Sequence, residues 1–122
     1  MVVDDNPDSV TIMRGILETQ HCEVLVASGG VEALKLVKRE KVDLLLLDIM
    51  MPEMSGLEVL QRIKEDAATR RLPVILVTAK TQDDDLLSGY QYGADYYITK
   101  PFTAKQLLFG VNLFLGKGES VE

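Results

Sequence analysis

Short apolar runs alternate along this chain with longer stretches in which apolar residues recur at helical spacing. Short apolar runs bounded by polar or turn residues are typical of strands, and the longer stretches are typical of amphipathic helices. The pattern predicts strands at residues 1–3, 23–27, 42–47, 74–78 and 96–99. The unbroken leucine run at 44–47 favours strands that helices cover on both faces, as in a parallel sheet.

The predicted helices have recognisable ends. Asn6 is an expected N-cap with Pro7 in the first helical position, and Thr103 is the expected N-cap of the last helix. The five helices are predicted after Asn6, over about 31–39, after Ser55 and Gly56, over about 82–92, and from Thr103 to near Gly116.

Five strand and helix units in alternation predict a doubly wound, flavodoxin-like α/β sheet of five parallel strands with five helices. We expect one domain over residues 1–116, followed by a flexible tail or the start of a linker at 117–122.

Composition and charge reduce the number of possible functions. The formal net charge of -6 argues against direct nucleic-acid binding, which rests on clustered Lys and Arg. No stretch approaches the roughly 20 apolar residues that span a bilayer, so we expect a cytoplasmic protein without membrane contact. The single cysteine, Cys22, cannot form an internal disulfide, and a buried, reduced thiol is the expected state.

Polar residues stand at the ends of four of the five predicted strands. Each one alone has an ordinary explanation as a cap or a loop residue, but ligands of such sheets bind at this edge. A joint role is therefore favoured for Asp4, Asp5, Asp48, Thr78 and Lys100. The three carboxylates would repel one another in one cleft unless a cation held them, and Mg²⁺ prefers oxygen ligands.

This set suits phosphoryl transfer, which needs positioning and charge stabilisation more than covalent chemistry. Asp48 is the expected nucleophile because it ends the most apolar strand. Lys100 is expected to pair with that carboxylate and then with phosphoryl oxygens, to which Thr78 would donate its hydroxyl.

The chain resembles the response regulator receiver family over nearly its whole length. The resemblance rests on Val2-Val3-Asp4-Asp5-Asn6, Leu47-Asp48-Ile49-Met50-Met51-Pro52, Ser55-Gly56, Pro73-Val74-Ile75, Val77-Thr78-Ala79 and Ile98-Thr99-Lys100-Pro101-Phe102. It implies strand order 2-1-3-4-5 and a phosphorylation-dependent switch of a two-component phosphorelay. The phosphoryl donor would be a histidine kinase or a histidine phosphotransfer protein.

The resemblance also implies a role for each matching residue. Mg²⁺ would be bound directly by Asp5, by Asp48 and by the backbone carbonyl of Met50, with Asp4 acting largely through water. Lys100 would precede a cis Pro101. Thr78 and Tyr97 would form the coupled switch pair, the ring rotating into space that the threonine vacates.

Three features concern regulation or the chain's ends. The first strand is short, so either the numbering starts inside the native chain or the edge of the core is thin. Met50 and Lys80 flank the site, and an apolar Met50 cannot orient an attacking water, so slow loss of the phosphoryl group is expected. Phe109 and Leu113 project from the far side of the last helix, where the helix 4, strand 5, helix 5 face would dimerise or bind a partner.

Three other functions share parts of this pattern. Haloacid dehalogenase phosphatases also place an Asp nucleophile after a strand, but they need a second Asp where Met50 stands, so turnover of phosphate esters is not expected. A flavodoxin-like cofactor carrier needs a phosphate-binding loop where this chain has Asp4 to Pro7. A receiver used only as an interaction module would not need the complete set of site residues.

Overall fold

The computed structural model describes residues 1–79 and 92–115. Within them the chain forms β1 (Val2–Val3), α1 (Pro7–Glu18), β2 (Val26–Ala27), α2 (Gly30–Arg39), β3 (Leu45–Leu47), α3 (Gly56–Glu65), β4 (Val74–Ala79), β5 (Tyr96–Lys100) and α5 (Ala104–Leu115). The helix expected over about 82–92 falls almost entirely outside the described residues and stays a prediction. The same holds for Lys80 and for the tail at 117–122.

One parallel sheet of five strands organises the fold, in the order β2-β1-β3-β4-β5. This confirms the predicted doubly wound architecture and its strand order. Val3 pairs with Leu47, and Leu47 pairs with Leu76, so β1 and β3 end side by side at one edge, where β4 continues to Ala79. The register therefore brings residues that are far apart in sequence to a common place.

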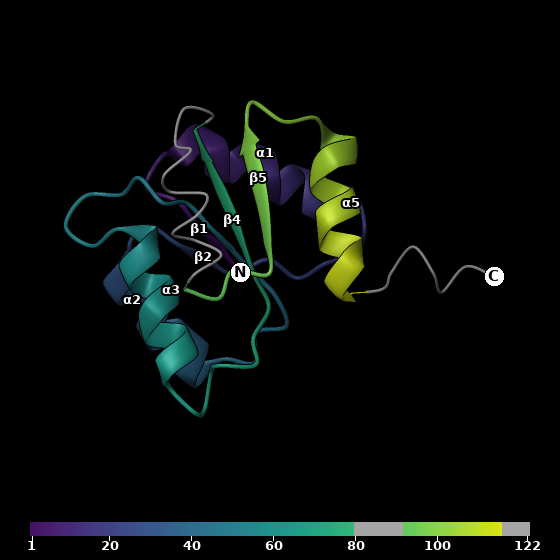
Figure 1. Ribbon diagram of the computed structural model, residues 1–122. Helices are drawn as coiled ribbons and strands as arrows, with labels where there is room; N and C mark the ends of the chain where they lie inside the picture. Colours follow the sequence, from purple (N-terminus) through teal and green to yellow (C-terminus); the bar gives the residue numbers. More distant parts are fainter. Residues whose placement is uncertain (80–91, 116–122) are drawn as a thin grey trace.

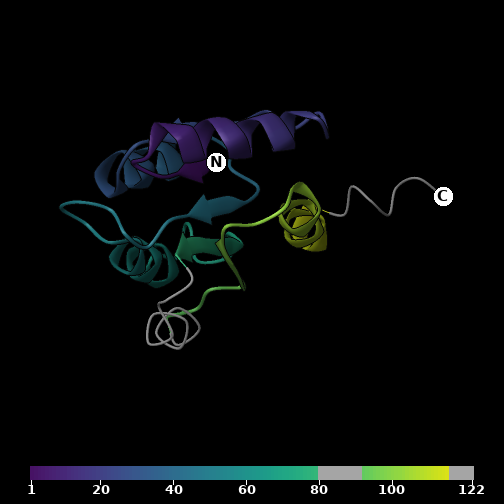
Figure 2. The ribbon, with the colours of Figure 1, turned by 90° about the horizontal axis from the view of Figure 1, so that it is seen from above.

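Helices cover both faces of the sheet. On one face α2 packs with α3 over an apolar cluster that includes Val3, Leu47 and Leu76. On the other face α1 packs with α5 over a cluster that includes Val2 and Leu46. Figure 1 shows the two helix pairs apart, and Figure 2 shows α3 and α5 on opposite sides of β4. Consecutive strand residues thus contribute to opposite cores, which explains why the strands are apolar throughout.

Side chains cap the helices where the sequence predicts it. The Asn6 side chain accepts hydrogen bonds from the amides of Asp8 and Ser9, and Pro7 opens α1. The Thr103 hydroxyl accepts from the amide of Gln106 at the start of α5. These bonds satisfy amide groups that have no partner within the helix, and they fix the residues at which α1 and α5 begin.

Two strand predictions are wrong at their N-terminal ends. The second strand begins at Val26 and not at residue 23, and the third begins at Leu45 and not at residue 42. Both segments have strand-like sequences, but β1 lies between them in the sheet and begins only at Val2. Residues without a strand neighbour have no ladder to join.

Two further observations bear on the sequence expectations. Cys22 is partly exposed and not buried as expected, although it packs against the core on the α1 and α5 side. Among the described residues, no helix is long and apolar enough to cross a membrane.

Candidate functional site

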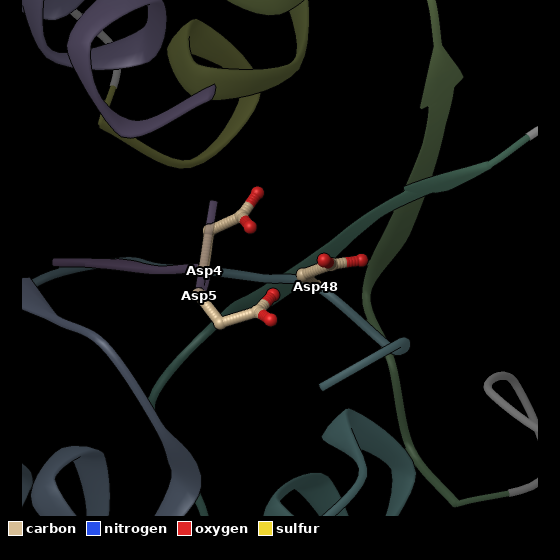
Figure 3. A group of neighbouring side chains, drawn as sticks. All are labelled: Asp4, Asp5 and Asp48. Carbon is tan, nitrogen blue, oxygen red and sulfur yellow. The ribbon is translucent and has the colours of Figure 1, made fainter. Parts of the chain in front are cut away.

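The structure brings the three predicted aspartates together. Asp4 and Asp5 follow β1, and Asp48 follows β3, the strand that pairs directly with β1. One carboxylate oxygen from each residue lies within 4.8 Å of the others. Figure 3 shows all three side chains projecting into the same space from these two strand ends.

The three carboxylates differ in their access to solvent. Asp4 and Asp48 are buried, with 1% and 7% of their surface exposed, whereas Asp5 is exposed. One oxygen of Asp4 accepts a hydrogen bond from the amide of Asn6. A cluster of oxygen ligands that is open on one side fits Mg²⁺, which keeps several waters when it binds to a protein.

Lys100 reaches this cluster from the end of β5. Its Nζ lies 2.8 Å from an oxygen of Asp4 and 3.8 Å from an oxygen of Asp48. The closer partner of the lysine is therefore Asp4, whereas the sequence analysis expected Asp48. Within residues 1–79 and 92–115, Lys100 is the only cation paired with this group of three carboxylates, so negative charge predominates among these side chains.

Ser9 is a site residue that the sequence pattern does not predict. Its hydroxyl oxygen lies 3.3 Å from Lys100 Nζ, which holds the lysine between α1 and the carboxylates. The only available sequence signal was its place in the first turn of the helix that follows the Asn6 cap. Its contact with a residue 91 positions away appears only in the fold.

Backbone contacts fix the position of Asp48. Its amide donates to the carbonyl of Val3, and one of its carboxylate oxygens accepts from the amide of Met50 at 3.3 Å. The loop after Asp48 folds back tightly, because the amide of Gly56 donates to the carbonyl of Ile49. A Cβ at position 56 would collide with the Asp48 carbonyl oxygen, so a larger residue there would displace the site backbone.

Thr78 and Tyr97 lie on the neighbouring strands β4 and β5. Thr78 is fully buried, and within the described residues its hydroxyl oxygen makes no hydrogen bond, although the hydroxyl lies near enough to Asp48 to lower the pKa of that carboxyl slightly. A buried hydroxyl without a full partner can donate to a newly arriving oxygen. Tyr97 is partly buried and packs against the α2 and α3 core.

The remaining predicted residues lie around this centre. The peptide bond between Lys100 and Pro101 is cis. Met50 is 57% exposed beside Asp48. Phe109 and Leu113 are exposed on α5, at 59% and 52%, so they are not part of the acidic cluster.

The pKa of Asp48 is raised from 3.8 to about 6. Burial is the largest cause, because it removes water from the charged form, and the negative charge of Asp4 adds to it. Lys100 and the amide of Met50 act in the opposite direction. Asp48 thus carries an electrostatic cost that a bound cation would relieve.

Comparison with known proteins places this arrangement in a family. The family model described as "Response regulator receiver domain" matches residues 1–112. The chain is 36% identical over 115 residues to Protein PilH of Pseudomonas aeruginosa, covering 94% of this chain and 95% of PilH. It is 37% identical over 119 residues to the alkaline phosphatase synthesis transcriptional regulatory protein PhoP of Bacillus subtilis, covering 98% of this chain. It spans about half, 49%, of PhoP.

Solved structures show the same fold. A response regulator receiver domain protein from Methanospirillum hungatei superposes with a TM-score of 0.87 at 29% identity, covering 99% of this chain and 95% of that one. The receiver domain of a sensor histidine kinase from Pseudomonas aeruginosa has a TM-score of 0.86 at 27% identity, covering 94% of each chain. That structure has a magnesium ion coordinated in its active-site cleft.

Replacing Asp48 with Asn should stabilise the metal-free protein in a pH-dependent way. Below about pH 4 Asp48 is protonated in both the folded and unfolded states, so its ionisation costs nothing. Between about pH 4 and 6 only the unfolded state releases the proton, and the folded state loses stability as pH rises. The advantage of Asp48→Asn in free energy of unfolding should therefore grow by roughly 2 kcal/mol from pH 4 to pH 7.

Urea unfolding in EDTA at a series of pH values measures this advantage. Asp66→Asn is the matched control, because the Ala68 amide and Lys38 lower the pKa of Asp66. Its ionised form stabilises the fold, so that variant should lose stability relative to the parent as pH rises. An advantage of Asp48→Asn that stays constant with pH would contradict the raised pKa.

Proposed function

The chain belongs to the response regulator receiver domain family of two-component signalling, and we propose that it is a phosphorylation switch with Asp48 as the phosphoryl acceptor. The supporting observation is the composition of the site. Three carboxylates lie within 4.8 Å of one another, and the ammonium group of Lys100 lies 3.8 Å from Asp48. This combination of nucleophile, cation and metal ligands meets the needs of phosphoryl transfer.

The reaction proceeds from a phosphohistidine of a histidine kinase or a histidine phosphotransfer protein. One carboxylate oxygen of ionised Asp48 attacks the phosphorus, and the bond from phosphorus to nitrogen breaks as the bond to oxygen forms. The histidine nitrogen keeps the electron pair, and Asp48 becomes an acyl phosphate. The contact of Met50 with Asp48 and the tight turn at Gly56 hold the carboxyl group in place for this step.

Asp5, Asp48 and the backbone carbonyl of Met50 are proposed as direct ligands of Mg²⁺, with Asp4 acting through water. When bound, the ion neutralises charge on the phosphoryl oxygens and on the carboxylates. The hydrogen bond from Lys100 to Asp4 supports this division, because Asp4 already has a cationic partner on one of its oxygens. Asp5, the most exposed of the three, offers its oxygens to an ion arriving from solvent.

Phosphorylation would change the protein's surface through Thr78 and Tyr97. The Thr78 hydroxyl, which has no hydrogen bond within the described residues, would donate to a phosphoryl oxygen. Its movement would leave space beside β5 for the Tyr97 ring. The charge change at Asp48 thereby reaches the face formed by β5 and α5.

The competing functions fit the site less well. A phosphatase of the haloacid dehalogenase type needs a general acid two residues after the nucleophile, and that residue here is the thioether Met50. A flavodoxin-like carrier would place phosphate against Asp4 and Asp5, which repel it. A purely structural receiver would have no need for a buried carboxylate whose pKa is raised to about 6.

Incubation with Mg²⁺ and acetyl phosphate should add one phosphoryl group to the protein, as measured by intact mass. Asp48→Asn should remove this uptake because it removes the nucleophile, and EDTA should remove it in the parent chain. Asp66→Asn is the control, since it changes a partly exposed carboxylate outside the site. Equal uptake by Asp48→Asn and the parent would place the modification elsewhere.

Met50 should make the phosphorylated state long-lived. An exposed thioether cannot orient a water molecule toward the acyl phosphate, whereas an amide can. Met50→Asn should therefore speed loss of the phosphoryl group by roughly tenfold, as followed by mass over time. Ile12→Asn makes the same change at a similarly exposed position on α1 and should leave the rate unchanged. Loss within seconds in the parent chain would refute the idea.

Phe109 and Leu113 are proposed as part of a homodimer or partner surface that includes β5, α5 and residues of the expected fourth helix. The two side chains lie one turn apart on α5 and are both exposed, and the Phe109 ring lies 6.5 Å from that of Tyr96 on β5. Replacing both with Ser should weaken self-association of the beryllofluoride-treated protein, as measured by sedimentation velocity across concentrations. Ile12→Ser with Val31→Ser removes two other exposed side chains and should not. Unchanged sedimentation of Phe109→Ser with Leu113→Ser would exclude this surface.

A further inference from the structure

A closed ring of hydrogen bonds joins Lys100 to the first turn of α1. The lysine ammonium group donates to Asp4 Oδ2 at 2.8 Å and to the Ser9 hydroxyl at 3.3 Å. The other oxygen of Asp4 accepts from the amide of Asn6 at 2.9 Å. The Asn6 side chain in turn accepts from the amide of Ser9 at 3.3 Å. The ring therefore connects the end of β1, the cap of α1, the first turn of that helix and the end of β5.

The Ser9 hydroxyl takes no part in capping the helix. Asn6 has that role, because its side-chain oxygen accepts from the amides of Asp8 and Ser9. Ser9 is partly buried, and within residues 1–79 and 92–115 its hydroxyl makes one hydrogen bond, the one that it accepts from Lys100. This hydroxyl therefore serves the lysine and not the helix.

The ring holds the ammonium group of Lys100 toward the β1 side of the site. In the sheet β3 and β4 lie between β1 and β5, so the lysine side chain extends from β5 across the end of β3 to reach Asp4. Its Nζ lies 3.8 Å from an oxygen of Asp48, which is beyond hydrogen-bond distance. An ammonium group has three protons to donate, and Asp4 and Ser9 take two of them. Before phosphorylation the lysine is thus engaged away from the nucleophile.

A phosphoryl group on Asp48 would draw the lysine toward it. Phosphoryl oxygens carry negative charge, and they bind an ammonium group more strongly than a neutral hydroxyl does. Release from Ser9 leaves no charge unpaired, because the hydroxyl is neutral. Release from Asp4 would leave a carboxylate whose side chain is fully buried without its cation, which is costly. The contact with Ser9 is therefore the weaker of the two that resist the movement.

From these contacts we propose that Ser9 is a positioning residue for phosphoryl transfer, which holds Lys100 beside Asp4 until the phosphoryl group arrives. The proposal rests on the proposed function of Asp48 as acceptor. An interaction that is made before transfer and lost in the transition state slows the reaction. Ser9 therefore limits the rate at which the protein is phosphorylated.

Side-chain NMR of the protein in EDTA tests the contact itself. The ¹³Cε signal of Lys100 and its attached protons should shift in Ser9→Ala, and they should return toward the parent values in Ser9→Thr, which keeps a hydroxyl. Thr11→Ala is the matched control, because Thr11 has a hydroxyl on the same helix that donates to the carbonyl of Pro7. It should leave the Lys100 signals unchanged. Identical Lys100 signals in Ser9→Ala and the parent would overturn the proposal.

The rate of phosphoryl uptake tests the effect on transfer. With Mg²⁺ and acetyl phosphate in excess, Ser9→Ala should take up the phosphoryl group roughly threefold faster than the parent, because one opposing hydrogen bond is lost. Ser9→Thr should bring the rate back toward that of the parent, and Thr11→Ala should not change it. Uptake by Ser9→Ala at or below the parent rate would show that the contact does not oppose transfer, and the proposal would be wrong.

The same measurement separates this proposal from the proposed function. If the parent takes up a phosphoryl group and Ser9→Ala does so at an equal rate, Asp48 keeps its role as acceptor and only the role of Ser9 is wrong. If the parent takes up none in the presence of Mg²⁺, both proposals fail. Asp48→Asn provides the reference for the absence of uptake.

Discussion

The parallel pairing of β1 with β3 is the contact on which both the core and the acidic site depend. Val3 lies beside Leu47, and the amide of Asp48 donates to the carbonyl of Val3. The same register sends Val2 and Leu46 to one core, and Val3 and Leu47 to the other. A shift of one residue would exchange the two cores and separate the carboxylates. Packing on both faces therefore fixes the geometry of the site.

This pairing concentrates like charges, and the structure balances them only in part. Lys100 is held by Asp4 and Ser9 and lies farther from Asp48. Asp48 is left buried, with a pKa raised to about 6. A site in this state favours an additional cation and responds strongly to a change in charge at Asp48. Such imbalance is what a charge-driven switch requires, because a fully paired site would gain little from a ligand.

The two ends of the sheet differ in physical character. At the carboxyl ends of the strands, helix caps such as Asn6 and a tight turn at Gly56 leave polar side chains directed at a shared space. At the amino ends, the backbone of residues 23–25 and 42–44 borders a cleft lined by both charged and apolar side chains. The polar side chains that can bind a ligand thus gather at the carboxyl edge. At the amino edge, the length of β1 limits how far β2 and β3 extend as strands.

The sequence by itself determined the architecture and most of the site. Alternating segments predict the five strands, cap residues predict where α1 and α5 begin, and polar residues at the strand ends predict the cluster. These signals lie in short stretches of sequence, so they can be interpreted without knowledge of the fold. The tertiary structure alone decided how far β2 and β3 extend, that Lys100 lies closer to Asp4 than to Asp48, and that Ser9 joins the site. These features depend on neighbours distant along the chain, and no local pattern encodes such neighbours.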